Sequence, residues 1–189
     1  MLFRSLYRDI LSNIRDWQIC ASLDGTGEIG EYIRTGLDYA QFYSNFSAGL
    51  EYATHPRQMR LDFTLTLPGM LEVTEMQALA QRWNVELLAK VIFSFTPDIV
   101  MSPLALPREI IDRKVDELVP ATRGALKDVL LQLKQRPTFA EQWPNQWQQG
   151  LARGKARVLQ LEQIRNDSFT MNDILKQDAD IHAWWQDIR

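Results

Sequence analysis

The pattern of hydrophobic and polar residues predicts alternating strands and helices in the first half of the chain. Apolar and polar positions alternate strictly over residues 59–67, as in a strand with one buried face. A short apolar run at 19–23 and a nearly continuous one at 87–95 predict two more strands, the second buried on both faces. Apolar residues recur every three or four positions over 28–54 and 73–83, which predicts helices. This order is typical of parallel βαβ units.

Three details refine this prediction. A helical pattern over residues 2–14 lacks an N-cap, as expected of a chain that begins inside an element. Gly36 is expected to break or bend the helix predicted over 28–54. The prolines within 97–107 restrict that stretch to an extended cover or an edge strand over Ile99–Leu106.

From residue 108 onward the pattern is helical only. The predicted helices span 108–118, 121–135, 138–165 and 170–187. Thr138 and Glu141 form a capping-box pair at the start of the third of these, and Pro144 is expected to split it. The Trp-rich stretch 141–149 has two interpretations, a partner-binding surface or a cover over a helical core, and the second is favoured.

Composition excludes several function classes. The 189 residues carry a net charge of -3, with 46% hydrophobic and 24% charged residues, which is typical of a packed domain. This charge gives no reason to expect nonspecific binding to nucleic acid or membranes, and no apolar run approaches the roughly 20 residues of a membrane span. The single cysteine, Cys20, excludes a disulfide framework and fits a cytoplasmic, reducing compartment. Its apolar neighbours predict an inert thiol in the core.

One candidate site follows the first predicted strand. Ser22 and Asp24 are two residues apart and project to one side of a strand, and Arg34 follows about three helical turns later. A hydroxyl, a carboxylate and a guanidinium at the carboxyl end of a strand suit a small polar ligand that carries diols and a carboxylate. The alternative is a turn in which Asp24 caps the next helix.

The longer string ASLDGTGEIGEYIRTGLDY resembles the fourth strand and fourth helix of radical SAM enzymes, in particular the group with SPASM or twitch extensions. The matching residues are Ser22, Asp24, Gly25, Glu28, Tyr32, Arg34, Gly36 and Tyr39. The resemblance is specific over residues 19–50 and looser to about residue 107. It implies that Ser22 and Asp24 lie near the ribose of S-adenosylmethionine, and that Arg34 pairs with the methionyl carboxylate.

The same resemblance points to missing parts. Radical SAM enzymes hold a 4Fe-4S cluster with three cysteines in a CxxxCxxC loop, and one thiol cannot replace them. The family's GGE segment is absent too, so the chain resembles only the C-terminal half of such a protein. Residues 1–107 would form half of a radical SAM-like β/α barrel, and residues 108–189 a helical extension that lacks cysteines for auxiliary clusters.

The resemblance implies an α/β fold and a portion of an enzyme whose intact form cleaves S-adenosylmethionine to start radical chemistry, with a peptide as the expected substrate. No catalytic or metal-binding residue is expected in this chain, and activity of the chain alone is not expected. A partner that supplies CxxxCxxC, or self-association, would complete the barrel. The alternatives are a non-catalytic remnant that acts as an interaction scaffold, and one chain of a split enzyme.

Overall fold

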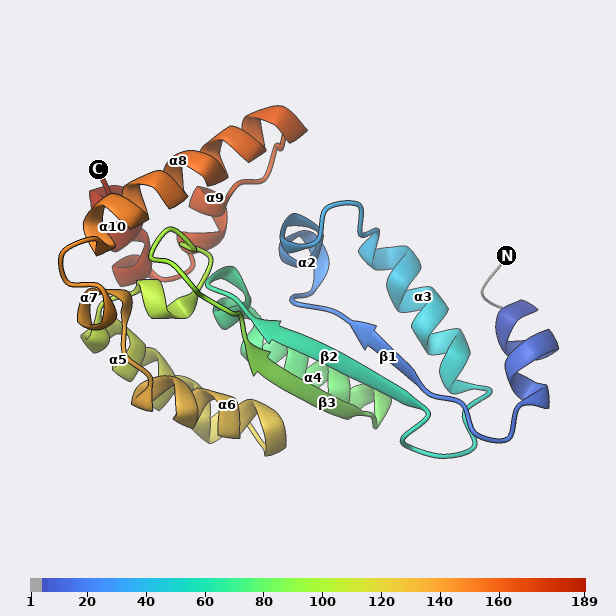
Figure 1. Ribbon diagram of the computed structural model, residues 1–189. Coiled ribbons are helices and arrows are strands. Elements are labelled where there is room, and N and C mark those ends of the chain that lie inside the picture. Colours follow the sequence, from blue (N-terminus) through green and yellow to red (C-terminus); the bar gives the residue numbers. More distant parts are fainter. Residues whose placement is uncertain (1–4) are drawn as a thin grey trace.

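The computed structural model describes residues 5–189 and contains a three-stranded, all-parallel sheet flanked by helices (Figure 1). The strands are β1 (Ile19–Ser22), β2 (Met59–Leu65) and β3 (Glu86–Val91), in the spatial order β1-β2-β3. Ile19 lies opposite Met59, and the pairing continues without a bulge to the end of β1. The predicted α/β class with parallel strands is confirmed.

Two helical connections join the strands. The first contains α2 (Gly27–Ile33) and α3 (Tyr39–Leu50), and the second contains a 3-10 helix (Pro68–Glu72) and α4 (Val73–Trp83). The predicted helix over 28–54 is therefore two helices, and the predicted break lies where Gly36 adopts a φ of 85°. The Asp38 side chain accepts a hydrogen bond from the Gln41 backbone and caps α3, which fixes the restart of the chain as a helix.

The two faces of the sheet differ in character. The alternation in β2 places Met59, Leu61, Phe63 and Leu65 in the core, where α3 and α4 cover them. Figure 1 shows α4 behind β2 and β3, whereas no helix of the described residues crosses the front of the sheet.

Polar side chains occupy this open front face. Arg60 and Asp62 of β2 form ion pairs with Glu86 and Lys90 of β3, at 3.1 and 2.6 Å. Both β3 residues are exposed, so the prediction of a third strand buried on both faces is wrong. Cys20 also projects from this side and is exposed. The core-thiol prediction is wrong because the side chains of neighbouring strand residues point to opposite faces.

The chain leaves the sheet earlier than its apolar pattern indicates. Strand β3 ends at Val91, and Phe93 and Phe95 beyond it are 72% and 82% exposed. The edge strand expected over Ile99–Leu106 is absent. Turns and a short 3-10 helix (Pro103–Ala105) take its place. Proline has no backbone N–H to donate to a neighbouring strand, and the Leu104 amide donates its hydrogen bond to the Ser102 hydroxyl instead.

The second half contains helices only, as predicted. They are α5 (Arg108–Leu118), a 3-10 turn (Val119–Ala121), α6 (Gly124–Gln135), α7 (Phe139–Gln142), α8 (Trp147–Arg165), α9 (Met171–Leu175) and α10 (Ala179–Asp187). The capping box of Thr138 and Glu141 is present, and Pro144 lies in the break between α7 and α8. Helix α6 packs along β3, and one hydrophobic core runs through both halves. Trp143 and Trp147 pack partly buried against this core, consistent with their interpretation as a cover.

The N-terminal segment differs from the regular helix predicted over residues 2–14. Residues 1–4 lie outside the described part, and the segment then forms a π-type turn (Leu6–Ile10) and a 3-10 turn (Leu11–Asn13). Tyr7 is buried and stacks on Tyr52, but Ile10 is exposed, so only part of the apolar stripe reaches the core. Within residues 5–189 no helix combines the length and the apolar character that crossing a membrane requires.

Candidate functional site

Asp24 lies where β1 stops pairing with β2. The last ladder bond of β1 runs from the Leu23 amide to the Asp62 carbonyl oxygen, at 3.0 Å. The next donor on β2 is the Thr64 amide, which donates a hydrogen bond to Asp24 Oδ1 at 2.7 Å. The carboxylate therefore replaces a strand carbonyl and satisfies a backbone N–H that would otherwise lack its partner.

Arg34 contacts the other oxygen of the same carboxylate. Arg34 is the C-cap of α2, and its Nε atom lies 2.9 Å from Asp24 Oδ2. The Asp24 side chain is 8% exposed and the Arg34 side chain 35% exposed. Both Asp24 oxygens are thus engaged, and the terminal nitrogens of Arg34 donate no hydrogen bond within residues 5–189. The pair leaves the outer edge of the guanidinium available to a second anion.

The structure brings two of the three sequence-predicted residues into contact. Ser22, the third, ends β1 opposite Asp62 and is half-buried. The alternative interpretation of Asp24 as a cap of the next helix is wrong. The N-cap of α2 is Thr26, and the oxygens of Asp24 bind Thr64 and Arg34 instead.

Glu72 holds the loop between β1 and α2. Its buried carboxylate accepts hydrogen bonds from the amide and the hydroxyl of Thr26, at 2.8 and 2.6 Å. The loop packs closely, because a Cβ added at Gly69 would lie 2.9 Å from the Asp24 carbonyl oxygen. Both contacts fix the path of the chain that carries Asp24, and the sequence alone does not indicate that Glu72, 46 residues beyond Thr26, takes part.

The helical extension supports the site from the other side. Glu162 of α8 accepts hydrogen bonds from the Tyr32 hydroxyl at 2.8 Å and from the Met171 amide at 2.6 Å. Burial and the hydrogen bond to Glu162 raise the pKa of Tyr32. Arg165 lies over the Tyr32 ring and donates to the Thr35 hydroxyl at 2.8 Å. These contacts tie the end of α2, and with it Arg34, to α8, and their sequence separation of about 130 residues hides them from sequence patterns.

An aromatic pair follows β3 at the same edge of the sheet. The rings of Phe93 and Phe95 are parallel, with centroids 6.1 Å apart. The loop beyond them is held firmly, because a Cβ added at Gly150 of α8 would lie 2.7 Å from the ring of Pro97. The carboxyl ends of parallel strands share one edge, so the fold presents two exposed phenyl rings on a fixed loop at the edge that carries Asp24.

The family resemblance implies two bound groups, a 4Fe-4S cluster and S-adenosylmethionine, and the side chains present fit only the second. One thiol in the chain does not fit a 4Fe-4S cluster, which needs three. Among residues 5–189, no three His, Cys, Asp or Glu side chains gather in an arrangement able to hold a metal ion. The outer edge of Arg34 and the hydroxyl of Ser22 fit a ligand with a carboxylate and hydroxyl groups.

Comparison of the whole chain with protein-family models, curated proteins and solved structures finds no match in any of the three. The chemistry of the site therefore rests on its own geometry. That geometry consists of a buried carboxylate that orients a guanidinium, a strand-end hydroxyl and an exposed aromatic pair, all at the carboxyl edge of one parallel sheet.

Proposed function

We propose that the chain is the C-terminal portion of a radical S-adenosylmethionine enzyme, consisting of half a β/α barrel and a helical extension, and that Ser22, Asp24 and Arg34 bind the cofactor. The observation that carries the proposal is the Asp24–Arg34 pair. Asp24 holds Nε, and the two terminal nitrogens of Arg34 are left to form a bidentate contact with the methionyl carboxylate. Ser22 supplies a hydroxyl partner for the ribose. Asp24 acts mainly by positioning Arg34, because its own oxygens are engaged.

The free edge of β1 supports the half-barrel part of the proposal. The amides of Ile19 and Leu23 donate to β2, so the backbone groups of Cys20 and Ser22 point away from it. Within residues 5–189 β1 pairs only with β2. Such an edge accepts another strand readily. In the proposal that strand comes from a segment that also supplies CxxxCxxC, or from self-association that covers the same edge.

The exposed pair Phe93 and Phe95 supports a peptide as the substrate. Leaving two phenyl rings in water gives up about 1.5–3 kcal/mol each relative to burial, and exposed apolar groups on a fixed loop are typical of binding surfaces. An apolar side chain of a peptide fits this surface. The proposal places the protein in the cytoplasm, where a reducing environment keeps Cys20 and cluster-binding thiols reduced.

A test of the site is a titration of the 15N-labelled chain with S-adenosylmethionine, followed by backbone amide NMR. We expect weak binding, because most cofactor contacts would lie on the missing segment, with shifts confined to Ser22, Thr64 and the region around Arg34. Arg34→Lys should abolish these shifts, since lysine lacks the planar fork. Methylthioadenosine, which lacks the amino-acid carboxylate, should bind equally to wild type and Arg34→Lys.

Arg153→Lys is the matched control, because Arg153 is exposed on α8 and forms no ion pair among residues 5–189. It should leave the S-adenosylmethionine shifts unchanged. Shifts that persist in Arg34→Lys, or that appear away from the carboxyl edge, would remove the site assignment.

The alternative function is a non-catalytic interaction scaffold, favoured by the open sheet face with its two ion pairs. The sequence of the DNA next to the coding region distinguishes the enzyme portion from the scaffold. If it encodes CxxxCxxC, co-expression of that segment should yield a complex that takes up iron and sulfide. The chain alone should take up no stoichiometric cluster, and if it does, the proposed division of the barrel is wrong. Without such a segment nearby, the scaffold alternative gains.

A further inference from the structure

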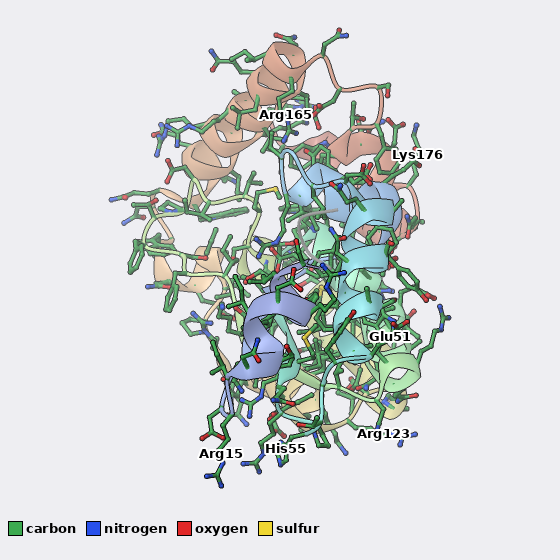
Figure 2. The ribbon with its side chains drawn as sticks, turned by 90° about the vertical axis from the view of Figure 1, so that its right-hand side faces the viewer. Arg15, Glu51, His55, Arg123, Arg165 and Lys176 are labelled. Atoms are coloured by element: carbon green, nitrogen blue, oxygen red, sulfur yellow. The ribbon has the colours of Figure 1, made fainter. Side chains whose placement is uncertain are left out.

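A concave surface lies at the amino edge of the sheet, opposite the edge that carries Asp24 and Arg34. A cavity of about 600 Å³ opens between the chain entering β1 and the turn entering β2. It is lined by Arg15, Asp16, Trp17, Gln18, Thr54, His55, Arg57, Gln58 and Arg60. Its volume lies within the range of small-molecule sites, about 300–1,000 Å³. Figure 2 shows Arg15 and His55 at the lower end of the molecule and Arg165 at the upper end.

The cavity gathers three guanidinium groups. Arg60 forms an ion pair with Glu86, at 3.1 Å. Arg15 and Arg57 form no ion pair among residues 5–189 and are exposed. Asp16 is the one carboxylate of the lining and Glu86 is the ion-pair partner of Arg60, so three guanidinium groups leave a net positive charge even when both carboxylates are counted.

The backbone that carries these residues is held in place. Gln58 is buried, and its side-chain oxygen accepts from the Thr54 and His55 amides, at 2.7 and 3.0 Å. The Gln18 side chain donates to the Arg57 carbonyl oxygen, at 2.8 Å, and ties the two walls together. The cavity therefore has fixed walls, and only the outer parts of the arginine side chains remain to be ordered by a ligand.

The hydrogen-bond inventory favours an anion. The Arg57 amide donates to His55 Nδ1 at 3.2 Å, so the proton of the neutral imidazole is assigned to Nε2, which becomes a donor. The Gln58 side-chain oxygen already accepts hydrogen bonds from Thr54 and His55 and is not available to a ligand. The other polar groups of the lining are mainly donors: three guanidinium groups, His55 Nε2 and the Trp17 indole N–H. Asp16 is the one charged acceptor of the lining.

We propose that this cavity binds the phosphate group of a small phosphorylated molecule. Guanidinium groups match phosphate oxygens in bidentate geometry, and several converging on one concave surface give a charge-assisted site. The chain's net charge of -3 argues against a polynucleotide as the source of the phosphate. The proposal is independent of cofactor binding at the carboxyl edge.

The test is a titration of the 15N-labelled chain with inorganic phosphate, against sodium chloride at equal ionic strength. Phosphate should shift the amides of the residues lining the cavity and leave Ser22 and Thr64 unchanged, and pyrophosphate should bind more tightly. Arg57→Ala and Arg15→Ala should each weaken phosphate binding about tenfold, the loss expected for one charge-assisted contact. Arg57→Lys should weaken it less, because the charge is kept while the fork is lost.

Arg136→Ala and Arg153→Ala serve as matched controls, since both arginines form no ion pair among residues 5–189 and lie outside the cavity. Both should bind phosphate as wild type does. Equal shifts with chloride, or unchanged phosphate affinity in Arg57→Ala and Arg15→Ala, would overturn the proposal. Tighter binding of a single-stranded oligonucleotide than of pyrophosphate would also overturn it, in favour of a nucleic-acid source.

Discussion

The two edges of the sheet both gather arginine, but in opposite states. At the carboxyl edge Arg34 is tied to a buried carboxylate, and that carboxylate is tied in turn to the backbone of β2. At the amino edge Arg15 and Arg57 are exposed and form no ion pair among the described residues, although the backbone beneath them is firmly held.

The arginine at the carboxyl edge is therefore expected to contribute to the stability of the fold, and the arginines at the amino edge to ligand binding. The buried carboxylate of Asp24 contributes to the fold, and removing it leaves a charge and a backbone donor without compensation. Exposed arginines without partners contribute little to the fold and are free to meet a ligand. Substitutions at the two edges should therefore change different measurements.

The largest expected effect is at Asp24. Asp24→Ala leaves the Thr64 amide and the Arg34 guanidinium without their partner, and should lower the free energy of unfolding by about 2–4 kcal/mol in urea denaturation. The matched control is Asp62→Ala, which removes the more exposed ion pair with Lys90 on the open face and should cost about 0–1 kcal/mol. Equal losses in the two variants would contradict the comparison.

A smaller effect is expected where the helical extension supports the carboxyl edge. Tyr32→Phe and Glu162→Gln each weaken the contact between α2 and α8, and should each lower the free energy of unfolding by about 0.5–2 kcal/mol. In a double-mutant cycle the loss in the double variant should differ from the sum of the two single losses by about 0.5 kcal/mol or more. Strict additivity would mean that the Tyr32–Glu162 bond does not couple the extension to the site.

The smallest effect on stability is expected at the amino edge. Arg15→Ala and Arg57→Ala should change the free energy of unfolding by less than about 0.5 kcal/mol, because their side chains are exposed and form no ion pair among residues 5–189. Urea denaturation in chloride buffer checks this. A loss above about 1 kcal/mol would mean that these arginines support the fold, and the contrast between the edges would fail.

The sequence predicted the sheet better than its surroundings. The strict alternation over residues 59–67 predicted β2 and its buried face, although the strand ends two residues earlier, at Leu65. The helix of Val73–Trp83 has the predicted bounds. The stretch after β3 was misassigned, because periodicity does not distinguish an apolar residue in the core from one that is exposed, as Phe93 and Phe95 are. The same limit applies to Cys20, which lies among apolar residues in sequence but faces the open side.

The candidate site was found only in part. The sequence grouped Asp24 and Arg34 at one strand–helix connection, but it assigned both side chains to a bound ligand and did not predict that they pair with each other. Glu72 and Glu162 gave no local signal, since their partners lie about 46 and 130 residues away. The amino-edge cavity was missed for the same reason: Arg15 and Arg57 are far apart in sequence and are brought together only when β1 and β2 pair.

The most direct test of the account is an amide NMR map of one sample of the chain, titrated first with S-adenosylmethionine and then with inorganic phosphate. We expect two separate sets of shifted amides. The cofactor should shift Ser22, Thr64 and the residues around Arg34, and phosphate should shift the residues around His55 and Arg57. A single shared set of shifts, or cofactor shifts at the amino edge, would contradict the assignment of different ligands to the two edges.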